Sequence, residues 1–119
     1  MDKLRIEDIK TCDGKSVIEG DVIRIHYSLA LSVADLEKGK YVESSYNTNT
    51  PIEVKVIPDN LLPGIFKGVL GMKAGGSKRR LYIPATLAFG SRGLDGKIQP
   101  DSPIIVEIVL SKILEPLFS

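Results

Sequence analysis

The amino-acid sequence predicts an α+β fold, in which a curved antiparallel sheet of five or six strands wraps over one short helix. Three observations support this prediction. Apolar and polar residues alternate with a period of two along several segments, only one segment has helical spacing, and paired glycines mark a tight corner between them. The 119 residues suffice for one hydrophobic core but not for two, so we expect a single domain over residues 1–119.

Several segments carry the alternation that is typical of half-buried strands. In residues 21–28, Ile23, Ile25 and Tyr27 fall on one face of a strand while His26 falls on the other. The same pattern recurs in residues 51–57, 78–83 and 104–110, and within residues 1–19 it suggests a further strand that includes Leu4, Ile6 and Ile9. Such strands belong to a largely antiparallel sheet with one face open to water.

Only the segment after residue 59 has the signals of a helix. Asn60 is a candidate N-cap, Pro63 is tolerated in a first turn, and Ile65 and Val69 share a face. The pair Gly75-Gly76 then provides a corner, because glycine adopts positive φ at little cost. Residues 32–40 and 89–103 are predicted as surface loops, and residues 114–119 as a tail.

Composition and charge exclude several classes of function. The formal net charge is +1, which provides no general attraction to nucleic acid, and no apolar run is long enough to span a bilayer. Cys12 is the only cysteine and His26 the only histidine, so neither an internal disulfide nor a Cys/His metal site is expected. We therefore expect a cytoplasmic monomer that needs no metal or cofactor.

The sequence also lacks the motifs of covalent or phosphate chemistry. No Gly-x-Ser-x-Gly elbow surrounds Ser44 or Ser45. Residues 71–78 read GMKAGGSK, but Ser77 and Lys78 stand in the reverse of the order that a phosphate-binding loop requires. The residues favour a shaped apolar pocket over an acid–base or nucleophilic centre.

From about residue 20 to residue 113 the chain resembles the FKBP-type peptidyl-prolyl cis–trans isomerases. Each matching motif is weak alone, but together they occur in the family's order and at compatible spacings. The motifs are Gly20-Asp21, His26-Tyr27, Gly39-Lys40, Ser44-Ser45, Pro63-Gly64, Gly68-Val69, the stretch GMKAGG from Gly71, the stretch RRLYIP from Arg79, Leu87-Ala88-Phe89-Gly90, and the closing stretch IVEIVL from Ile105.

The resemblance implies a half-barrel of five or six antiparallel strands over a short helix, with a shallow apolar cavity between them. In this family the cavity binds an Xaa-Pro segment and rotates its amide, against a barrier of roughly 18–20 kcal/mol that comes mainly from amide resonance. Carried over by position, the catalytic groups are Tyr27, Glu43, Leu62 through its backbone N–H, and Phe89; the substrate-binding residues are Val42, Ile52, Leu61, Ile65, Ile98 and Val106.

The chain departs from the family pattern mainly in this pocket. Ile65 stands where the family usually has a tryptophan floor, Glu43 replaces an aspartate, and Phe89 replaces a loop tyrosine; Val42, Ile52 and Val106 stand in place of phenylalanines. Apolar contact is worth about 25 cal/mol per Å², so the lost rings predict weak activity and weak or no binding of tacrolimus-like macrolides. Two functions stay open: a prolyl isomerase acting on proline-containing peptides and protein clients, or a non-catalytic peptide- or protein-binding module.

Overall fold

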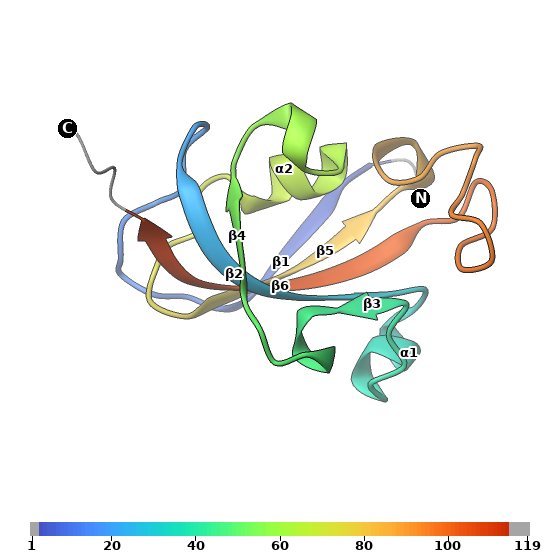
Figure 1. Ribbon diagram of the computed structural model, residues 1–119, viewed down its shortest axis with the longest axis horizontal. Helices are drawn as coiled ribbons and strands as arrows, with labels where there is room; N and C mark the ends of the chain where they lie inside the picture. Colours follow the sequence, from blue (N-terminus) through green and yellow to red (C-terminus); the bar gives the residue numbers. More distant parts are fainter. Residues whose placement is uncertain (1–2, 115–119) are drawn as a thin grey trace.

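The computed structural model describes residues 3–114, which form one antiparallel sheet wrapped around a short helix (Figure 1). The strands follow one another along the sheet in the order β1-β5-β6-β2-β3, and β4 also pairs with β2. The six strands are β1 Arg5–Lys10, β2 Val22–Ala30, β3 Glu43–Ser44, β4 Ile52–Lys55, β5 Ser77–Ile83 and β6 Ile104–Leu114. This architecture confirms the α+β fold predicted from the sequence.

The hydrophobic core lies between helix α2, Pro63–Val69, and the concave face of the sheet. The residues of β2, β5 and β6 that were predicted to share an apolar face lie toward the core, whereas Ile52 on β4 is exposed. On β2 the buried side chains of Ile23 and Ile25 alternate with half-exposed neighbours. On β5 and β6 the core residues are Leu81, Ile83, Ile104, Val106, Ile108 and Leu110, all without exposed surface. Alternation therefore located the core correctly because each strand presents one face to it.

Helix α2 begins differently from the prediction. Asn60 is not its N-cap: the cap position is Leu62, and no side chain caps the helix there. Asn60 instead ends the 3₁₀ turn η2, Pro58–Asn60, and its Nδ2 donates to the Lys55 carbonyl oxygen at 3.2 Å. A proline at the first helical position has no N–H to satisfy, so α2 needs less from a cap.

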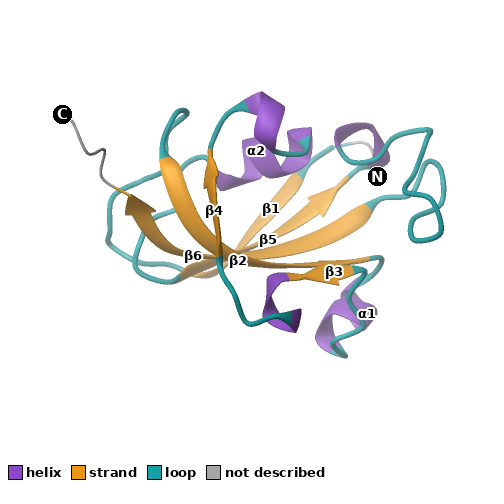
Figure 2. Cartoon of the chain, in the orientation of Figure 1, coloured by secondary structure: helices purple, strands orange, loops and turns teal. Residues whose placement is uncertain are grey.

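Residues 32–40, predicted as a loop, contain the short helix α1, Val33–Glu37. Ser32 caps it by accepting a hydrogen bond from the Asp35 N–H at 3.1 Å. Leu36 is buried with Ala30 and Ile105 on the side of the sheet opposite α2 (Figure 2). A five-residue helix is not stable alone, so contact with the sheet, which the sequence does not show, decides that it forms.

The predicted N-terminal strand is confirmed as β1, which lies at the edge of the sheet beside β5. Leu4 packs against the core, whereas Ile6 and Ile9 are largely exposed because an edge strand is covered on fewer sides. The predicted tail, residues 114–119, begins with the last residue of β6, and its remainder lies outside the described residues. Within residues 3–114 no helix has the length and apolar character needed to cross a membrane.

Candidate substrate-binding cavity

A cavity of about 230 Å³ opens between the start of α2 and the concave face of the sheet. Its walls are apolar apart from one carboxylate and one carboxamide. The lining residues are Ile25, Tyr27, Leu29, Glu43, Ile52, Asn60, Leu61, Leu62, Ile65, Phe89 and Ile108. A concave, mostly apolar site with few polar groups is the usual form of a small-ligand site.

The period of two in the strands brings many of these residues to the same place. Ile25, Tyr27 and Leu29 are alternate residues of β2, so all three face the cavity. Ile108 on β6 lies directly opposite Tyr27 in the strand pairing. Ile65, in the first turn of α2, adds the helix side of the cavity.

The chain before α2 presents a backbone donor at the cavity. Leu61 and Leu62 are extended, with ψ angles of 149° and 144°. Among the described residues, the N–H of Leu62 donates to no backbone or side-chain acceptor. A donor on a residue that lines the cavity is available to a carbonyl group of a bound ligand.

The polar group that β2 contributes to the cavity, the Tyr27 hydroxyl, is hydrogen-bonded to a residue of β3. The Tyr27 hydroxyl donates a hydrogen bond to Glu43 Oε1 on β3. Burial and then the hydrogen bond and negative charge of Glu43 raise the pKa of Tyr27 to about 12 from 10.0. The phenol therefore stays protonated at neutral pH and holds the carboxylate at the edge of the cavity.

Ser44 and Ser45 fix this pair by tying β3 to β2. The Tyr27 N–H donates to Ser45 Oγ at 2.8 Å, and Ser44 Oγ donates to the Tyr27 carbonyl oxygen at 3.1 Å. His26 Nδ1 lies 2.8 Å from Ser45 Oγ, and the His26 ring stacks on Tyr46 with centroids 4.3 Å apart. The Ser44-Ser45 motif thus acts through the backbone of Tyr27, and no nucleophilic role is needed to explain it.

The structure brings most of the predicted site residues to one cavity and leaves three outside it. Those on the cavity are Tyr27, Glu43, Ile52, Leu61, Leu62, Ile65 and Phe89. Val106 lies opposite Leu29 and Leu81 and is fully buried in the core. Val42, immediately before β3, packs against the same core, and its N–H donates to the Leu29 carbonyl oxygen at 2.8 Å. Ile98 is buried under its own loop, where it bridges to Leu94.

Four lining residues were not among the predicted site residues: Ile25, Leu29, Asn60 and Ile108. The first two are alternate neighbours of Tyr27, and Ile108 alternates with Val106 on the last strand, so the same period of two contained the signal. No such pattern placed Asn60 on the cavity wall. The sequence instead predicted this residue as the N-cap of the helix.

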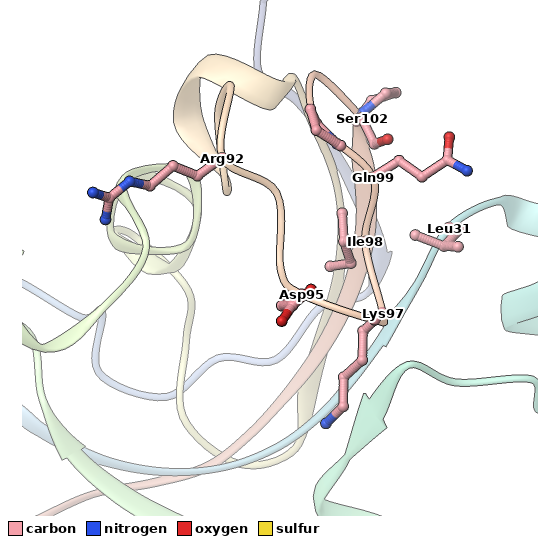
Figure 3. Close-up of a pocket in the computed structure, with 10 residues that line it drawn as sticks. Leu31, Arg92, Asp95, Lys97, Ile98, Gln99 and Ser102 are labelled. Carbon is pink, nitrogen blue, oxygen red and sulfur yellow. The ribbon is translucent and has the colours of Figure 1, made fainter.

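A larger cavity, of about 720 Å³, lies under the loop that precedes β6 (Figure 3). Its walls carry charged side chains, including Arg92, Asp95 and Lys97, and the figure shows Arg92 directed away from Ile98 and Leu31. The smaller cavity combines mainly aliphatic walls, the N–H of Leu62, which donates to no acceptor among the described residues, and a positioned carboxylate. We regard the smaller cavity as the candidate site because the apolar residues, Leu62 and Glu43 all line it.

Within residues 3–114 no three side chains of histidine, cysteine, aspartate or glutamate lie close enough together to hold a metal ion. The described lining of the cavity offers an apolar surface, hydrogen-bonding groups and one carboxylate.

Comparison with known proteins identifies the family. Residues 14–111 match the family model of the FKBP-type peptidyl-prolyl cis-trans isomerases. The chain belongs to this family. The FKBP-type domain is 35% identical over 115 residues to an FK506-binding protein of Neisseria meningitidis serogroup A, an alignment covering 97% of this chain and 100% of that protein.

Two further relatives agree with this assignment. The FKBP-type domain is 36% identical over 91 residues to the peptidyl-prolyl cis-trans isomerase FPR2 of Saccharomyces cerevisiae, covering 76% of this chain and 64% of that one. It superposes on the crystal structure of AtFKBP13 with a TM-score of 0.79 and 29% identity, covering 93% of both chains. The half-barrel fold implied by the resemblance is confirmed.

Proposed function

We propose that this FKBP-type domain catalyses cis–trans isomerisation of Xaa-Pro bonds in the cavity between α2 and the sheet. The observation that carries the proposal is the combination of apolar walls with the unpaired N–H of Leu62. Proline-containing peptides and protein clients are the proposed substrates.

The reaction needs no nucleophile, because no bond other than the amide's partial double bond is disturbed. The twisted amide has lost resonance and is less polar at its carbonyl, so an apolar site binds it better than the planar form. Each 1.36 kcal/mol of selective binding accelerates the reaction about tenfold. The walls of the cavity supply this selectivity.

Each predicted catalytic group has a part in that scheme. Ile65 provides the surface on which the proline ring rests. The Leu62 N–H donates to a substrate carbonyl. The Tyr27–Glu43 pair places a hydrogen-bonded carboxylate at the edge of the cavity. Phe89 contributes its ring but no hydroxyl, so one hydrogen bond to the ligand that a tyrosine there would make is missing.

The aliphatic character of the lining leads us to propose low activity and weak or no macrolide binding. Among the residues that the structure describes, Tyr27 and Phe89 are the ones that contribute aromatic rings to the cavity. Ile52 leaves 37% of its surface exposed, so it closes the wall less fully than a larger ring would. Less contact means weaker binding of both planar and twisted amide.

The same observation favours a second candidate function, a peptide-binding module without significant catalysis. A cavity that holds the planar and twisted amide equally well binds peptide but does not accelerate rotation. The two functions differ in one measurement, the rate of isomerisation.

The test is NMR exchange spectroscopy on tetrapeptides with leucine or phenylalanine before proline, at micromolar protein. We expect the wild type to accelerate exchange and Phe89→Ala to lose about tenfold or more of that acceleration. Leu31→Ala, in the larger cavity, is the matched control and should retain it. Binding without acceleration would establish the module instead, and loss in Leu31→Ala alone would move the site to the larger cavity.

We also propose that the protein is a cytoplasmic monomer that binds neither nucleic acid nor membranes. A single cysteine suits a reducing compartment, and a net charge of +1 provides no general attraction to nucleic acid or a membrane surface. Light scattering after size exclusion checks the monomer, and cell fractionation checks the compartment.

A further inference from the structure

Glu43 is the only charged side chain that lines the candidate cavity within the described residues. Oε1 accepts the hydrogen bond from Tyr27, and no other hydrogen bond is made by either carboxylate oxygen there. None of the ion pairs within residues 3–114 includes Glu43. Its negative charge at the rim of an apolar cavity is thus left without a positive partner from the protein.

The position of this charge can be related to a bound substrate. In the proposed binding mode the proline ring rests on Ile65, and we place the residue before proline toward the cavity edge. The side chain of Glu43 is solvent-exposed at that edge and belongs to β3, whereas Ile65 belongs to α2. Asn60 also lines the cavity, and its amide nitrogen donates to the Lys55 carbonyl oxygen.

We propose that Glu43 is a specificity-determining residue that favours substrates with lysine or arginine immediately before proline. This inference rests on the proposed isomerase function and narrows its substrate class. A cationic side chain gains the attraction of an unneutralised carboxylate, and its methylene stem packs on the apolar wall. An acidic residue at the same position is repelled, and a neutral one gains nothing from the charge.

The positioning of Glu43 makes this preference stronger than that of a freely rotating surface carboxylate. Tyr27 holds one carboxylate oxygen, and Ser44 and Ser45 hold the strand that bears it. Ordering a side chain before binding removes part of the entropic cost of forming an ion pair. Exposed ion pairs still change equilibria by only about two- to fivefold, so we expect a preference of about threefold.

The experiment compares tetrapeptides that differ only in charge, with lysine or acetyl-lysine before proline. The ratio of their kcat/KM values is measured by NMR exchange spectroscopy for wild type, Glu43→Gln and Glu19→Gln, at low salt and at 1 M salt. Glutamine still accepts the Tyr27 hydrogen bond but removes the charge. Glu19→Gln removes the same charge at an exposed site outside the cavity. Using the ratio cancels any general loss of activity in Glu43→Gln.

We expect a ratio of about three for wild type and Glu19→Gln at low salt, falling to one in Glu43→Gln and at 1 M salt. A wild-type ratio of one, or a ratio unchanged in Glu43→Gln, overturns the inference while isomerisation of leucine-proline peptides leaves the proposed function standing. If no peptide is isomerised, the proposed function fails, and the dissociation constants of the same two peptides then decide the inference alone: equal values overturn it, and a threefold preference that disappears in Glu43→Gln supports it.

Discussion

Tyr27 and Glu43 are joined by a hydrogen bond across β2 and β3, and burial together with this contact raises the pKa of the Tyr27 phenol. The pair is the main polar feature of an otherwise apolar cavity. The pair links β2 of the core sheet to the two-residue edge strand β3. We therefore expect loss of this hydrogen bond to change the position of Glu43 at the edge of the cavity.

The first prediction concerns pH. The pKa of Tyr27 is about 12 in the folded protein and 10.0 when unperturbed. Between these values the unfolded chain has released the phenolic proton while the folded one retains it, so the free energy of unfolding falls as pH rises from about 10 to about 12. Below pH 10 both states hold the proton and this contribution is fully present.

The measurement is the absorbance of phenolate during alkaline titration, in parallel with urea unfolding at each pH. Tyr27→Phe should remove the phenol whose pKa is raised and lessen the loss of stability above pH 10. Tyr46→Phe is the control, because Tyr46 is exposed and stacks on His26 without contacting Glu43. Titration curves of Tyr27→Phe and wild type that coincide after each is scaled to its number of tyrosines would refute the raised pKa.

The second prediction concerns the cavity floor. Ile65→Trp adds aromatic surface to a cavity of about 230 Å³ whose floor is now aliphatic. Roughly 100 Å² of new contact at about 25 cal/mol per Å² corresponds to about 2.5 kcal/mol. Because Ile65 is only partly buried, we count about half of that contact, which corresponds to about 1.4 kcal/mol. We expect kcat/KM for leucine-proline peptides and affinity for a tacrolimus-like macrolide to rise about tenfold.

Ile65→Leu is the control, since it preserves volume without adding a ring. If Ile65→Trp folds and neither quantity changes, the floor is not at Ile65. If affinity rises without kcat/KM, the new contacts bind the planar and twisted amide equally.

The third prediction concerns the approach of α2 to the sheet. A Cβ at Gly68 would lie 2.4 Å from Leu81 Cδ1 and 2.6 Å from Leu81 Cδ2. Leu81 has no exposed surface, so its methyl groups have nowhere to move. We expect Gly68→Ala to lower the free energy of unfolding by about 1–3 kcal/mol, despite the better helix propensity of alanine.

A double-mutant cycle with Leu81→Val tests this mechanism. Shortening Leu81 removes the clashing methyl groups, so the second substitution should cost less in the Gly68→Ala background than alone. Strict additivity in urea unfolding would contradict the steric explanation. Lys67→Ala, at an exposed position of the same helix, should change stability little.

The fourth prediction concerns the end of α2. Arg79 Nη1 donates to the carbonyl oxygens of Gly68 and Leu70, each at 3.0 Å, and Arg79 Nε donates to Asp8 Oδ1 at 2.8 Å. The arginine side chain is 13% exposed and that of Asp8 is 49% exposed. The two partly buried hydrogen bonds to the end of α2 should therefore contribute more to the free energy of unfolding than the ion pair with Asp8.

We expect Arg79→Met to cost about 2–3 kcal/mol of stability and Asp8→Asn less than about 1 kcal/mol. Thermal or urea unfolding of both variants checks the order. Equal costs would mean that the ion pair, and not the capping of α2, is the main contribution of Arg79.

The strand pattern and the glycine corner predicted the sheet and the core, because a period of two places residues on a face without reference to the rest of the chain. It was enough to set Ile23, Leu81 and Ile108 inside. The family was predicted separately, from the ordered motifs that resemble it. The resemblance then placed Tyr27, Glu43 and Ile65 on one cavity.

Tertiary structure decided what depends on neighbours distant in sequence. Helix α1 forms because Leu36 packs against Ile105 on one face of the sheet. Asn60 does not cap α2; its amide nitrogen donates to the Lys55 carbonyl oxygen, and the residue lines the cavity. Val42, Ile98 and Val106 lie outside the cavity because packing, not position in a motif, directs a side chain once its strand is placed. Local patterns determine which face a residue takes, but the partners on that face are chosen only when the whole chain packs together.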